Sequence, residues 1–434
     1  MQTATYLIGR HRTLFNLRIQ LVVFAHFGRE VLAGRLPARG FFGFLDRLRY
    51  FLSKMRENKY VTASGTTKIN LYVPGYPSPA FFKACAKVAT IGVKQPCISV
   101  LLSVTSACRF RCAHCYQRFD RGKDMPIELL TDVVRRLDAM GVAFFNIEGG
   151  DPFLAYDRLH AVCAAVTNGE IWVNSTGEGI TDERLTALRG LGMKGVMFSL
   201  HAPDEETVNR FMGRDSAWST MLRGMECCRA VGVDIAVNSC LLRPAYSDGT
   251  FERLMDLARE LGVTIIQLIK PKPSGAWLDT ELDPFTEDDL AHVTRLVHDY
   301  NNAPQCRAYP FIAAQIIDER ADMFGCTAGG TDRFYINAKG DVQPCEFLNI
   351  SFGNLRDEDF DSIYNRMRKT FDIPGSRWLC ETCAHDIHAL RDFSGSDTLP
   401  LDPSLSMQIH AHWNRGEPGD FYRYADVRFR TPGS

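Results

Sequence analysis

Residues 97–116 read CISVLLSVTSACRFRCAHCY, an apolar run followed at once by a loop that contains three cysteines. The apolar part predicts a buried strand, and the loop carries Cys108, Cys112 and Cys115. Three thiolates at this spacing can bind three irons of a cubane iron–sulfur cluster and leave the fourth iron open. An open coordination position is how a metal centre binds and activates a second molecule. Structural zinc would need a fourth ligand, and His114 lies between two of the cysteines, where it is poorly placed to reach the same ion.

From residue 97 onward, strand-like and helix-like segments alternate. Six strand–helix units in series predict a parallel sheet, and right-handed crossovers curve it into a partial (β/α)6 TIM-like barrel of the α/β class. Functional groups are then expected at the carboxyl ends of the strands. The expected strands are 97–104, 142–147, 171–174, 195–200, 233–238 and 264–269, and the expected helices are 126–140, 156–167, 181–191, 218–230 and 250–261.

Four more cysteines are gathered in the last quarter of the chain. Cys326 and Cys345 flank a hairpin predicted at 337–340, and Cys380 and Cys383 form a Cys-x2-Cys pair. Four thiolates fit either zinc or a fully ligated iron–sulfur cluster, and the spacing alone leaves both open. The remaining cysteines are expected to behave as small buried apolar residues. They are Cys85, Cys97, Cys163, Cys227, Cys228, Cys240 and Cys306.

The composition of the whole chain excludes several classes of protein. Among its 434 residues, 50 Lys and Arg stand against 51 Asp and Glu, so no affinity for nucleic acid is expected from net charge. No apolar run reaches the roughly 18–20 residues that cross a bilayer, and the N-terminus lacks the layout of a signal peptide. Fourteen cysteines in such a chain indicate metal binding or catalysis rather than disulfides. We therefore expect a cytoplasmic protein.

The first 60 residues are basic, with eleven Lys and Arg against three Asp and Glu. They predict an amphipathic helix, a second helix over Phe41–Met55 and a hairpin over 60–73. Two interpretations stay open. The helices pack on the barrel and leave a basic face in solvent, or residues 1–58 contact an anionic membrane, which makes the protein peripheral to the inner membrane face. The first helix is predicted from the spacing of Leu14, Leu17, Leu21, Phe24 and Val31.

The first cysteine loop resembles the Cys-x3-Cys-x2-Cys signature of the radical SAM superfamily. The segment Gly149-Gly150-Asp151-Pro152, after the second strand, is similar to the Gly-Gly-Glu-Pro motif of that family, with Asp in place of Glu. The resemblance implies that the loop cysteines hold a [4Fe-4S] cluster that binds S-adenosylmethionine (SAM), and that the backbone of residues 149–152 recognises the amino group of SAM.

Three further residues are expected to contact SAM. The resemblance implies such contacts for Ser199 at the fourth strand and Asn238 at the fifth. Arg243, just past the fifth strand, is a candidate because arginine can bind a carboxylate with two hydrogen bonds. Four other residues could handle protons or anions near the site, or could simply pack: Tyr116, His201, Lys270 and Lys272.

The late cysteines resemble the SPASM extension of radical SAM enzymes. The resemblance rests on Cys326, on Gly340-x4-Cys345 and on Gly353-Asn354-Leu355. It favours a second, auxiliary [4Fe-4S] cluster held by Cys326, Cys345, Cys380 and Cys383. No cysteine follows Cys383, so ligands remain for one auxiliary cluster, as in the shortened twitch variant.

The resemblance implies an enzyme that reductively cleaves SAM to a 5′-deoxyadenosyl radical and abstracts hydrogen from a C–H bond. A fully ligated auxiliary cluster suits electron transfer, so we expect oxidative modification of a peptide or protein, with a flavodoxin- or ferredoxin-type reductant. The alternative is a lipid, polyprenyl or other small-molecule substrate at the membrane surface. A non-catalytic metal-binding protein would explain the cysteines but not the Gly-Gly-Asp-Pro turn.

Four units are predicted along the chain. They are a basic helical segment with a hairpin (1–95), the radical SAM core barrel (96–303), a small α+β cluster-binding domain (304–394) and a tail rich in Pro, Gly and Ser that we expect to be weakly ordered (395–434).

Overall fold

The computed structural model describes residues 4–35, 38, 41–89 and 97–429. Its centre is a nine-stranded sheet in the order β10-β9-β8-β7-β6-β5-β4-β11-β12. Neighbouring strands are parallel from β10 to β11, and β12 pairs antiparallel with β11. The predicted partial barrel of the α/β class is confirmed. Its strands are β4 (Ser99–Ser103), β5 (Phe144–Glu148), β6 (Glu170–Ser175), β7 (Met193–Ser199), β8 (Asp234–Cys240), β9 (Ile265–Ile269), β10 (Phe311–Ala314), β11 (Arg333–Ile336) and β12 (Val342–Gln343).

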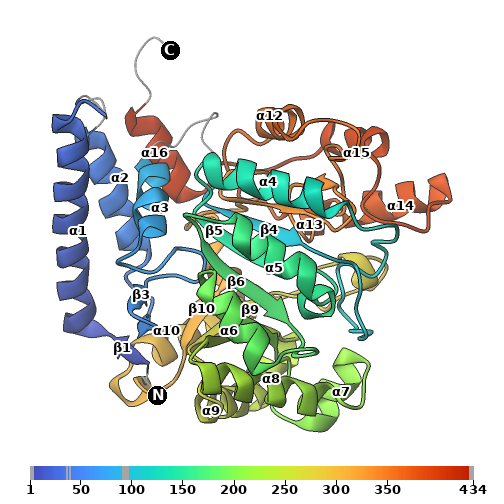
Figure 1. The fold of residues 1–434 in the computed structure, drawn as a ribbon, viewed down its shortest axis with the longest axis horizontal. Helices are drawn as coiled ribbons and strands as arrows, with labels where there is room; N and C mark the ends of the chain where they lie inside the picture. Colours follow the sequence, from blue (N-terminus) through green and yellow to red (C-terminus); the bar gives the residue numbers. More distant parts are fainter. Residues whose placement is uncertain (1–3, 36–37, 39–40, 90–96, 430–434) are drawn as a thin grey trace.

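Helices cover the outer face of this sheet (Figure 1). In α4 (Ile127–Ala139), the side chains of Leu130, Val133 and Leu137 are buried at helical spacing, in the same core as the outward residues of β4. The five helices predicted between strands are confirmed, but one helix, α7, was missed. Asp204 caps it by accepting a hydrogen bond from the Thr207 N–H at 2.9 Å. The helices are α4 (Ile127–Ala139), α5 (Tyr156–Ala165), α6 (Asp182–Gly190), α7 (Glu205–Met212), α8 (Ala217–Val231), α9 (Thr250–Glu260) and α10 (Glu287–Asn302).

The sheet continues beyond the predicted barrel segment. Strands β10 and β11 both come after residue 303, yet β10 pairs with β9 and β11 pairs with β4. The hairpin expected at 337–340 connects β11 to β12. The C-terminal region therefore shares one sheet and one apolar core with the barrel.

The N-terminal segment forms a small three-stranded sheet and three helices. The predicted hairpin is confirmed at its start, where Ser64 and Gly65 have φ of 46° and 80° between β2 and β3. The expected strand beyond Lys68 does not form, because residues 69–73 leave the hairpin and run beneath the barrel. The elements are β1 (Thr5–Leu7), α1 (Gly9–Leu32), α2 (Phe41–Lys54), β2 (Tyr60–Ala63), β3 (Thr66–Lys68) and α3 (Pro79–Ala89).

Helix α1 forms as predicted, but it does not bury the apolar stripe that predicted it. Its buried residues are Ile19, Val23 and Phe27, and the ring of Phe27 packs 4.6 Å from that of Phe44 on α2. This row, at a spacing of four residues, faces α2. The predicted stripe points outward instead, with Leu14 63% and Leu21 71% exposed.

The N-terminal segment closes the floor of the barrel. Val61 and Leu71 are buried against apolar residues near the amino ends of the barrel strands, among them Phe144 and Trp172. Below them the Lys68 ammonium lies 2.5 Å from the Glu170 carboxylate, and both side chains are buried. The Glu170 carboxylate also accepts hydrogen bonds from the Gly75 N–H and the Trp172 indole. Residues 60–76 are thus part of the barrel rather than a separate appendage.

The prediction of a weakly ordered tail after residue 395 needs correction, because about half of its described part is helical. Asp402 caps α15 by accepting from the Ser404 and Leu405 N–H groups, and Phe421 of α16 is buried. Helix α16 packs against α2, where Asp420 accepts from the Lys54 ammonium at 2.5 Å. The C-terminal helices are α11 (Gln315–Asp318), α12 (Phe360–Thr370), α13 (Leu379–Thr382), α14 (Ala384–Ser394), α15 (Pro403–His410) and α16 (Asp420–Phe429).

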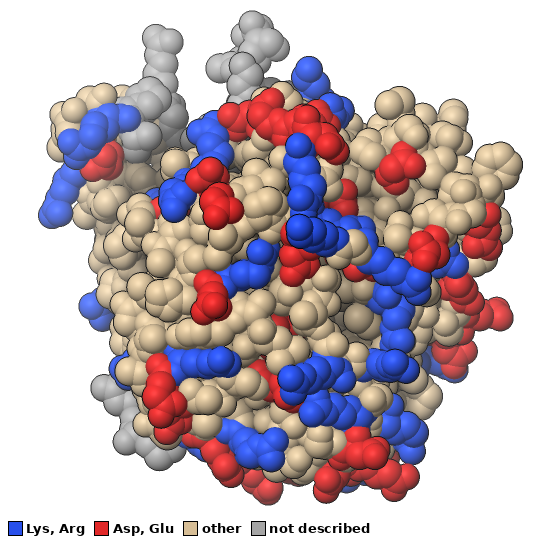
Figure 2. Space-filling view, turned by 45° about the vertical axis from the view of Figure 1, so that its right-hand side comes forward, with Lys and Arg blue, Asp and Glu red and all other residues tan. Residues whose placement is uncertain are grey.

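The surface carries both signs of charge. On the face drawn in Figure 2, acidic and basic side chains are interspersed rather than separated into large patches. Among the described residues, no helix is both long and apolar enough to cross a membrane.

Candidate functional site

A cavity of about 510 Å³ lies inside the barrel at the carboxyl ends of its strands. The cavity is lined by the first cysteine loop and also by Arg333, Glu346 and Phe347 of the C-terminal region. The cavity therefore reaches from the first group of cysteines toward the second. Its place at this end of the strands is the one that the barrel fold predicts.

The three cysteines of the first loop lie close together on the cavity wall. The loop is held by the Ala113 N–H, which donates to the Phe211 carbonyl at 2.8 Å. Burial raises the pKa of Cys108 to about 11 and raises that of Cys112 as well. The neighbouring thiols raise the pKa of Cys112 further, and the Arg118 guanidinium opposes this.

This geometry fits the cluster that the motif implies. Across the described ranges, no three Cys, His, Asp or Glu side chains converge on one point as a single metal ion requires. A cubane cluster needs no such convergence, since each thiolate binds a different iron. Cys115 raises the pKa of Cys108, both raise that of Cys112, and all three line the cavity, as three ligands of one cluster should.

Gly149 and Gly150 lie against the cysteine loop with no room for side chains. A Cβ atom on Gly150 would lie 2.1 Å from the Ala107 carbonyl oxygen, and one on Gly149 would lie 2.4 Å from that of Thr105. Gly149 also has a φ of +151°, which other residues rarely adopt. Glycine is therefore required at both positions, and their backbone borders the cavity.

Asp151, which replaces the glutamate of the family motif, is fully buried, and its carboxylate is hydrogen-bonded within the chain. Its carboxylate accepts hydrogen bonds from the N–H of Phe153 at 3.1 Å, from the Ser175 hydroxyl at 3.0 Å, and from the N–H and hydroxyl of Thr176. Burial raises the pKa of Asp151 to about 6, although these hydrogen bonds act to lower it. The side chain thus ties the end of β5 to the end of β6.

The other SAM-contact candidates are placed differently from one another. Ser199 and Asn238 both line the cavity, and the Asn238 Oδ1 is buried without a hydrogen-bond partner among the described residues. Arg243 lies in a short 3-10 helix (Arg243–Tyr246), where it pairs with Asp283 at 3.3 Å and Asp289 at 3.6 Å. It is not among the residues that line the cavity, so the structure does not bring it to the other candidates.

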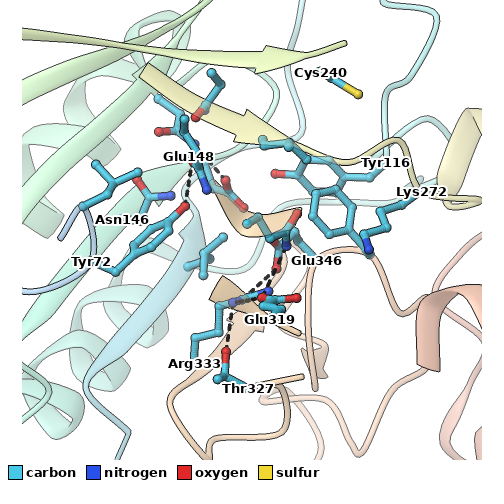
Figure 3. Close-up of a pocket in the computed structure, with 18 of the residues that line it drawn as sticks. Tyr72, Tyr116, Asn146, Glu148, Cys240, Lys272, Glu319, Thr327, Arg333 and Glu346 are labelled. Atoms are coloured by element: carbon cyan, nitrogen blue, oxygen red, sulfur yellow. Dashed lines mark hydrogen bonds and ion pairs between the residues drawn. The ribbon is translucent and has the colours of Figure 1, made fainter. Parts of the chain in front are cut away.

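The interior of the barrel is polar where many such barrels are filled by branched apolar side chains. Asn146 and Glu148 of β5 and Asn174 of β6 line the cavity (Figure 3). Both polar atoms of the Asn146 amide and one oxygen each of Glu148 and Asn174 are buried with no partner in the described structure. From the floor, the Tyr72 hydroxyl donates to Gln267 of β9 at 3.0 Å. Buried polar atoms are normally paired, so these unpaired groups point to a polar ligand.

Glu148 is the titratable group at the centre of this interior. Its Oε2 accepts from the Asn174 amide at 3.1 Å, while Oε1 has no partner in the described residues. Burial, followed by repulsion from Glu346, raises its pKa from 4.5 to about 8. Sequence reasoning missed Asn146 and Glu148. The signal was two polar residues at alternate positions in the strand FFNIE, directly before the double glycine.

The late cysteines lie beside basic side chains. Burial raises the pKa of Cys380 to about 12, the Lys272 ammonium opposes this, and Cys326 lies near enough to raise it further. Cys345 is buried too, with the Arg333 guanidinium 3.9 Å from its sulfur. Cys383 is buried and follows Cys380 by one helical turn. The structure thus brings Cys326, Cys345 and Cys380 within electrostatic reach of one another.

Arg333 is itself fixed in a buried network. Its guanidinium lies 2.5 Å from the Glu319 carboxylate and donates to the Thr327 hydroxyl at 3.0 Å, and Glu346 lies 3.8 Å away (Figure 3). These contacts leave it little freedom to reach a ligand deep in the cavity. It holds a positive charge beside Cys345.

The remaining candidates are all near the cavity. The Nδ1 of His201 accepts from the Cys240 N–H at 3.1 Å, and burial lowers its pKa, so the ring is neutral. Tyr116 is buried and interacts with Glu148 (Figure 3), which raises the pKa of Tyr116 in addition to burial and lowers that of Glu148. Lys270 and Lys272 both pair with Glu381, at 2.9 and 3.1 Å, which directs them to the cysteine pair of the C-terminal region.

Two sequence families match this chain where the two cysteine groups lie. The model of the radical SAM superfamily matches residues 102–258, and that of SPASM, an iron–sulfur cluster-binding domain, matches residues 326–384. The chain is therefore a radical SAM enzyme with a SPASM domain. Its cofactors are SAM, the [4Fe-4S] cluster that binds SAM, and auxiliary iron–sulfur in the SPASM domain.

Known proteins resemble it at a distance. The AdoMet-dependent heme synthase of Oleidesulfovibrio alaskensis is 25% identical over 293 residues, which cover 62% of this chain and 75% of that protein. The structure of Streptococcus suis SuiB bound to its precursor peptide SuiA aligns with a TM-score of 0.51 and 16% identity over 65% of this chain and 68% of that one. The structure of anSMEcpe with AdoMet and the Cp18Cys peptide aligns with a TM-score of 0.50 and 16% identity over 77% and 98%. At such identities the structures support the shared fold alone.

Proposed function

We propose that this enzyme binds a peptide or protein segment in the barrel cavity and oxidises it by radical chemistry. The polar interior carries the proposal: Asn146, Glu148 and Asn174 present buried amide and carboxyl atoms that lack partners in the described structure. A peptide offers donors and acceptors of matching kind along its backbone. An alkyl chain would leave each of these groups unpaired, at a cost of about 1–3 kcal/mol apiece.

The loop residues would hold the cofactors. Cys108, Cys112 and Cys115 would bind the cluster, and the backbone of residues 149–152 with Ser199 and Asn238 would orient SAM beside it. When bound, this pair supplies a radical that takes a hydrogen atom from the substrate. Asp151 acts as a positioning residue, because it fixes the double-glycine turn to β6.

Glu148 would handle the proton of the oxidation. Its Oε1 faces the cavity unpaired, and its pKa of about 8 lies near neutral pH, where a group transfers protons most effectively. In the protonated form it can donate to a substrate carbonyl. In the ionised form it can accept the proton that the substrate radical loses, and auxiliary iron–sulfur held by the SPASM domain would be the acceptor of the accompanying electron.

A peptide substrate is compatible with this fold. SuiB and anSMEcpe, whose folds align with this chain, were both solved with a bound peptide. The relatives named AdoMet-dependent heme synthase leave a small-molecule substrate as the competing class. The polar cavity argues against the lipid or polyprenyl substrate among the alternatives raised by the sequence.

A test uses the anaerobically reconstituted enzyme with SAM, a chemical reductant and pools of synthetic peptides. We expect some pools to raise the rate of 5′-deoxyadenosine release and to contain a peptide that has lost two hydrogen atoms, measured by mass spectrometry. Glu148→Gln should lower peptide oxidation by about 10²–10⁴-fold, while the exposed control Glu226→Gln should leave it unchanged. Stimulation by a small-molecule extract and by no peptide pool would contradict the proposal.

A further inference from the structure

The outward face of α1 is the most apolar exposed surface of the described chain. Nine large hydrophobic side chains are exposed in the described residues, and six of them lie on α1 or at the start of α2. Monomeric soluble proteins seldom expose such a group without a binding role. The six are Leu14 (63% exposed), Leu17 (52%), Leu21 (71%), Phe24 (48%), Leu32 (90%) and Phe42 (78%).

The α1 members form one stripe. Leu14, Leu17, Leu21 and Phe24 follow the spacing of three and four residues that keeps side chains on one face of a helix. Leu32 comes eighteen residues after Leu14, which at 3.6 residues per turn returns to the same side. The opposite side of α1 is already buried against α2. Of the stripe, Phe24 reaches α2, with its ring centroid 5.2 Å from that of Phe41, while the four leucines stay more than half exposed.

Figure 1 shows why the leucines of this stripe stay exposed among the described residues. Helix α1 is the outermost element on its side of the molecule, and α2 and α3 lie between it and the sheet. The outer side of α1 faces away from every described element.

The charges beside the stripe are all positive. Arg10 and Arg18 lie one turn before and after Leu14, and Arg29 lies further along the helix. All three are exposed, and none has an ion-pair or hydrogen-bond partner within the part of the chain that the structure describes. Glu30 is the single acidic residue of α1, and Arg35 pairs with it through two hydrogen bonds of 2.6 Å. A leucine stripe with free arginines along it is the pattern of a helix that lies in a lipid interface.

We propose that the α1 face docks on the surface of an anionic phospholipid bilayer. The leucines would enter the boundary between headgroups and acyl chains, and Arg10, Arg18 and Arg29 would pair with lipid phosphates. A second copy of this chain fits the face poorly, because it would place these arginines against like charges. The proposal is independent of the proposed substrate and would stand if that substrate were wrong.

The test measures co-sedimentation of the full chain with vesicles of phosphatidylcholine, alone or with an equal part of phosphatidylglycerol. We expect binding to the anionic vesicles, weakened by high salt. Leu14→Glu/Leu21→Glu should lose binding to background. Arg18→Gln/Arg29→Gln should bind the anionic vesicles about thirtyfold more weakly, since each arginine near such a surface contributes a factor of about five.

The matched control is Phe393→Glu/Met407→Glu, which changes two exposed apolar residues of the C-terminal region (89% and 59% exposed). It should bind like the parent, and all variants should keep the parent's thermal unfolding curve. Three results would overturn the proposal: no binding of the parent to anionic vesicles, equal binding by the leucine variant, or equal loss by the control. Light scattering adds a fourth, a dimer that Leu14→Glu/Leu21→Glu converts to monomer, which would assign the face to a second copy.

Discussion

The ammonium of Lys272 lies 3.1 Å from the carboxylate of Glu381, the residue that follows Cys380 in the Cys-x2-Cys pair. Lys272 follows β9 of the barrel, and its side chain is 2% exposed. It also lowers the pKa of Cys326 and Cys380, against the effect of their burial. A barrel residue thus supplies positive charge to the cysteines of the SPASM domain, which links the two sites electrostatically as well as through the shared sheet.

Lys272→Met should therefore change the auxiliary iron–sulfur centre. Removing a buried positive charge beside thiolates disfavours the reduced, more negative state, so we expect the midpoint potential to fall by on the order of 50 mV. Redox titration followed by electron paramagnetic resonance measures this. Lys123→Met, which removes an exposed lysine, is the control and should leave the potential in place. An unchanged potential in Lys272→Met would mean that the ammonium does not act on the cluster.

Glu148 should make stability fall as pH rises. Its pKa is about 8 in the folded protein against an ordinary value of 4.5, so the folded state holds this proton more tightly than the unfolded chain. Between about pH 4.5 and about pH 8 the folded state binds more protons, and the free energy of unfolding contributed by this group declines with rising pH.

Glu148→Gln keeps the shape of the side chain and removes the titration. We expect the urea midpoint of the variant to decline less than that of the parent across this range of pH. The exposed control Glu226→Gln should decline like the parent. Parallel curves for Glu148→Gln and the parent would show that the carboxyl is ionised throughout.

The sequence predicted the parts of the site that local pattern encodes. The spacing of Cys108, Cys112 and Cys115 and the Gly149-Gly150 turn are visible without a structure, because each lies within a few residues at a strand end. The polar interior was not predicted, since Asn146, Gln267 and Tyr72 come from distant elements and meet only through sheet register and the floor.

The errors have physical causes too. The stripe of Leu14, Leu17 and Leu21 has the correct period for a helix, but period does not decide which face is buried. The buried face is that of Ile19, Val23 and Phe27, because these side chains pack against the aromatic face of α2. The composition of the tail, rich in Pro and Gly, predicted weak order. The N-cap at Asp402 and the burial of Phe421 nevertheless stabilise helices there.

The ion pair beneath the barrel predicts how strongly the N-terminal segment is joined to it. Lys68→Met would leave the Glu170 carboxylate buried without its cation, and breaking such a pair costs about 3–5 kcal/mol of unfolding free energy. Urea unfolding measures this loss. The double variant Lys68→Met/Glu170→Gln should recover part of it, because no charge then stays buried. A loss near that of the exposed control Arg210→Met would show that the pair does not secure the floor.

Iron analysis separates the two metal sites. The first loop and the late cysteines form two separate ligand sets, so Cys108→Ala/Cys112→Ala/Cys115→Ala should remove one cluster and leave the other. We expect about eight irons per chain in the anaerobically reconstituted parent and about four in the variant, with sulfide in proportion. Cys85→Ala/Cys163→Ala, which changes two buried cysteines outside both sets, should retain the parent's iron. About four irons and one zinc in the parent would make the late cysteines a structural zinc site and remove the electron acceptor that an oxidation requires.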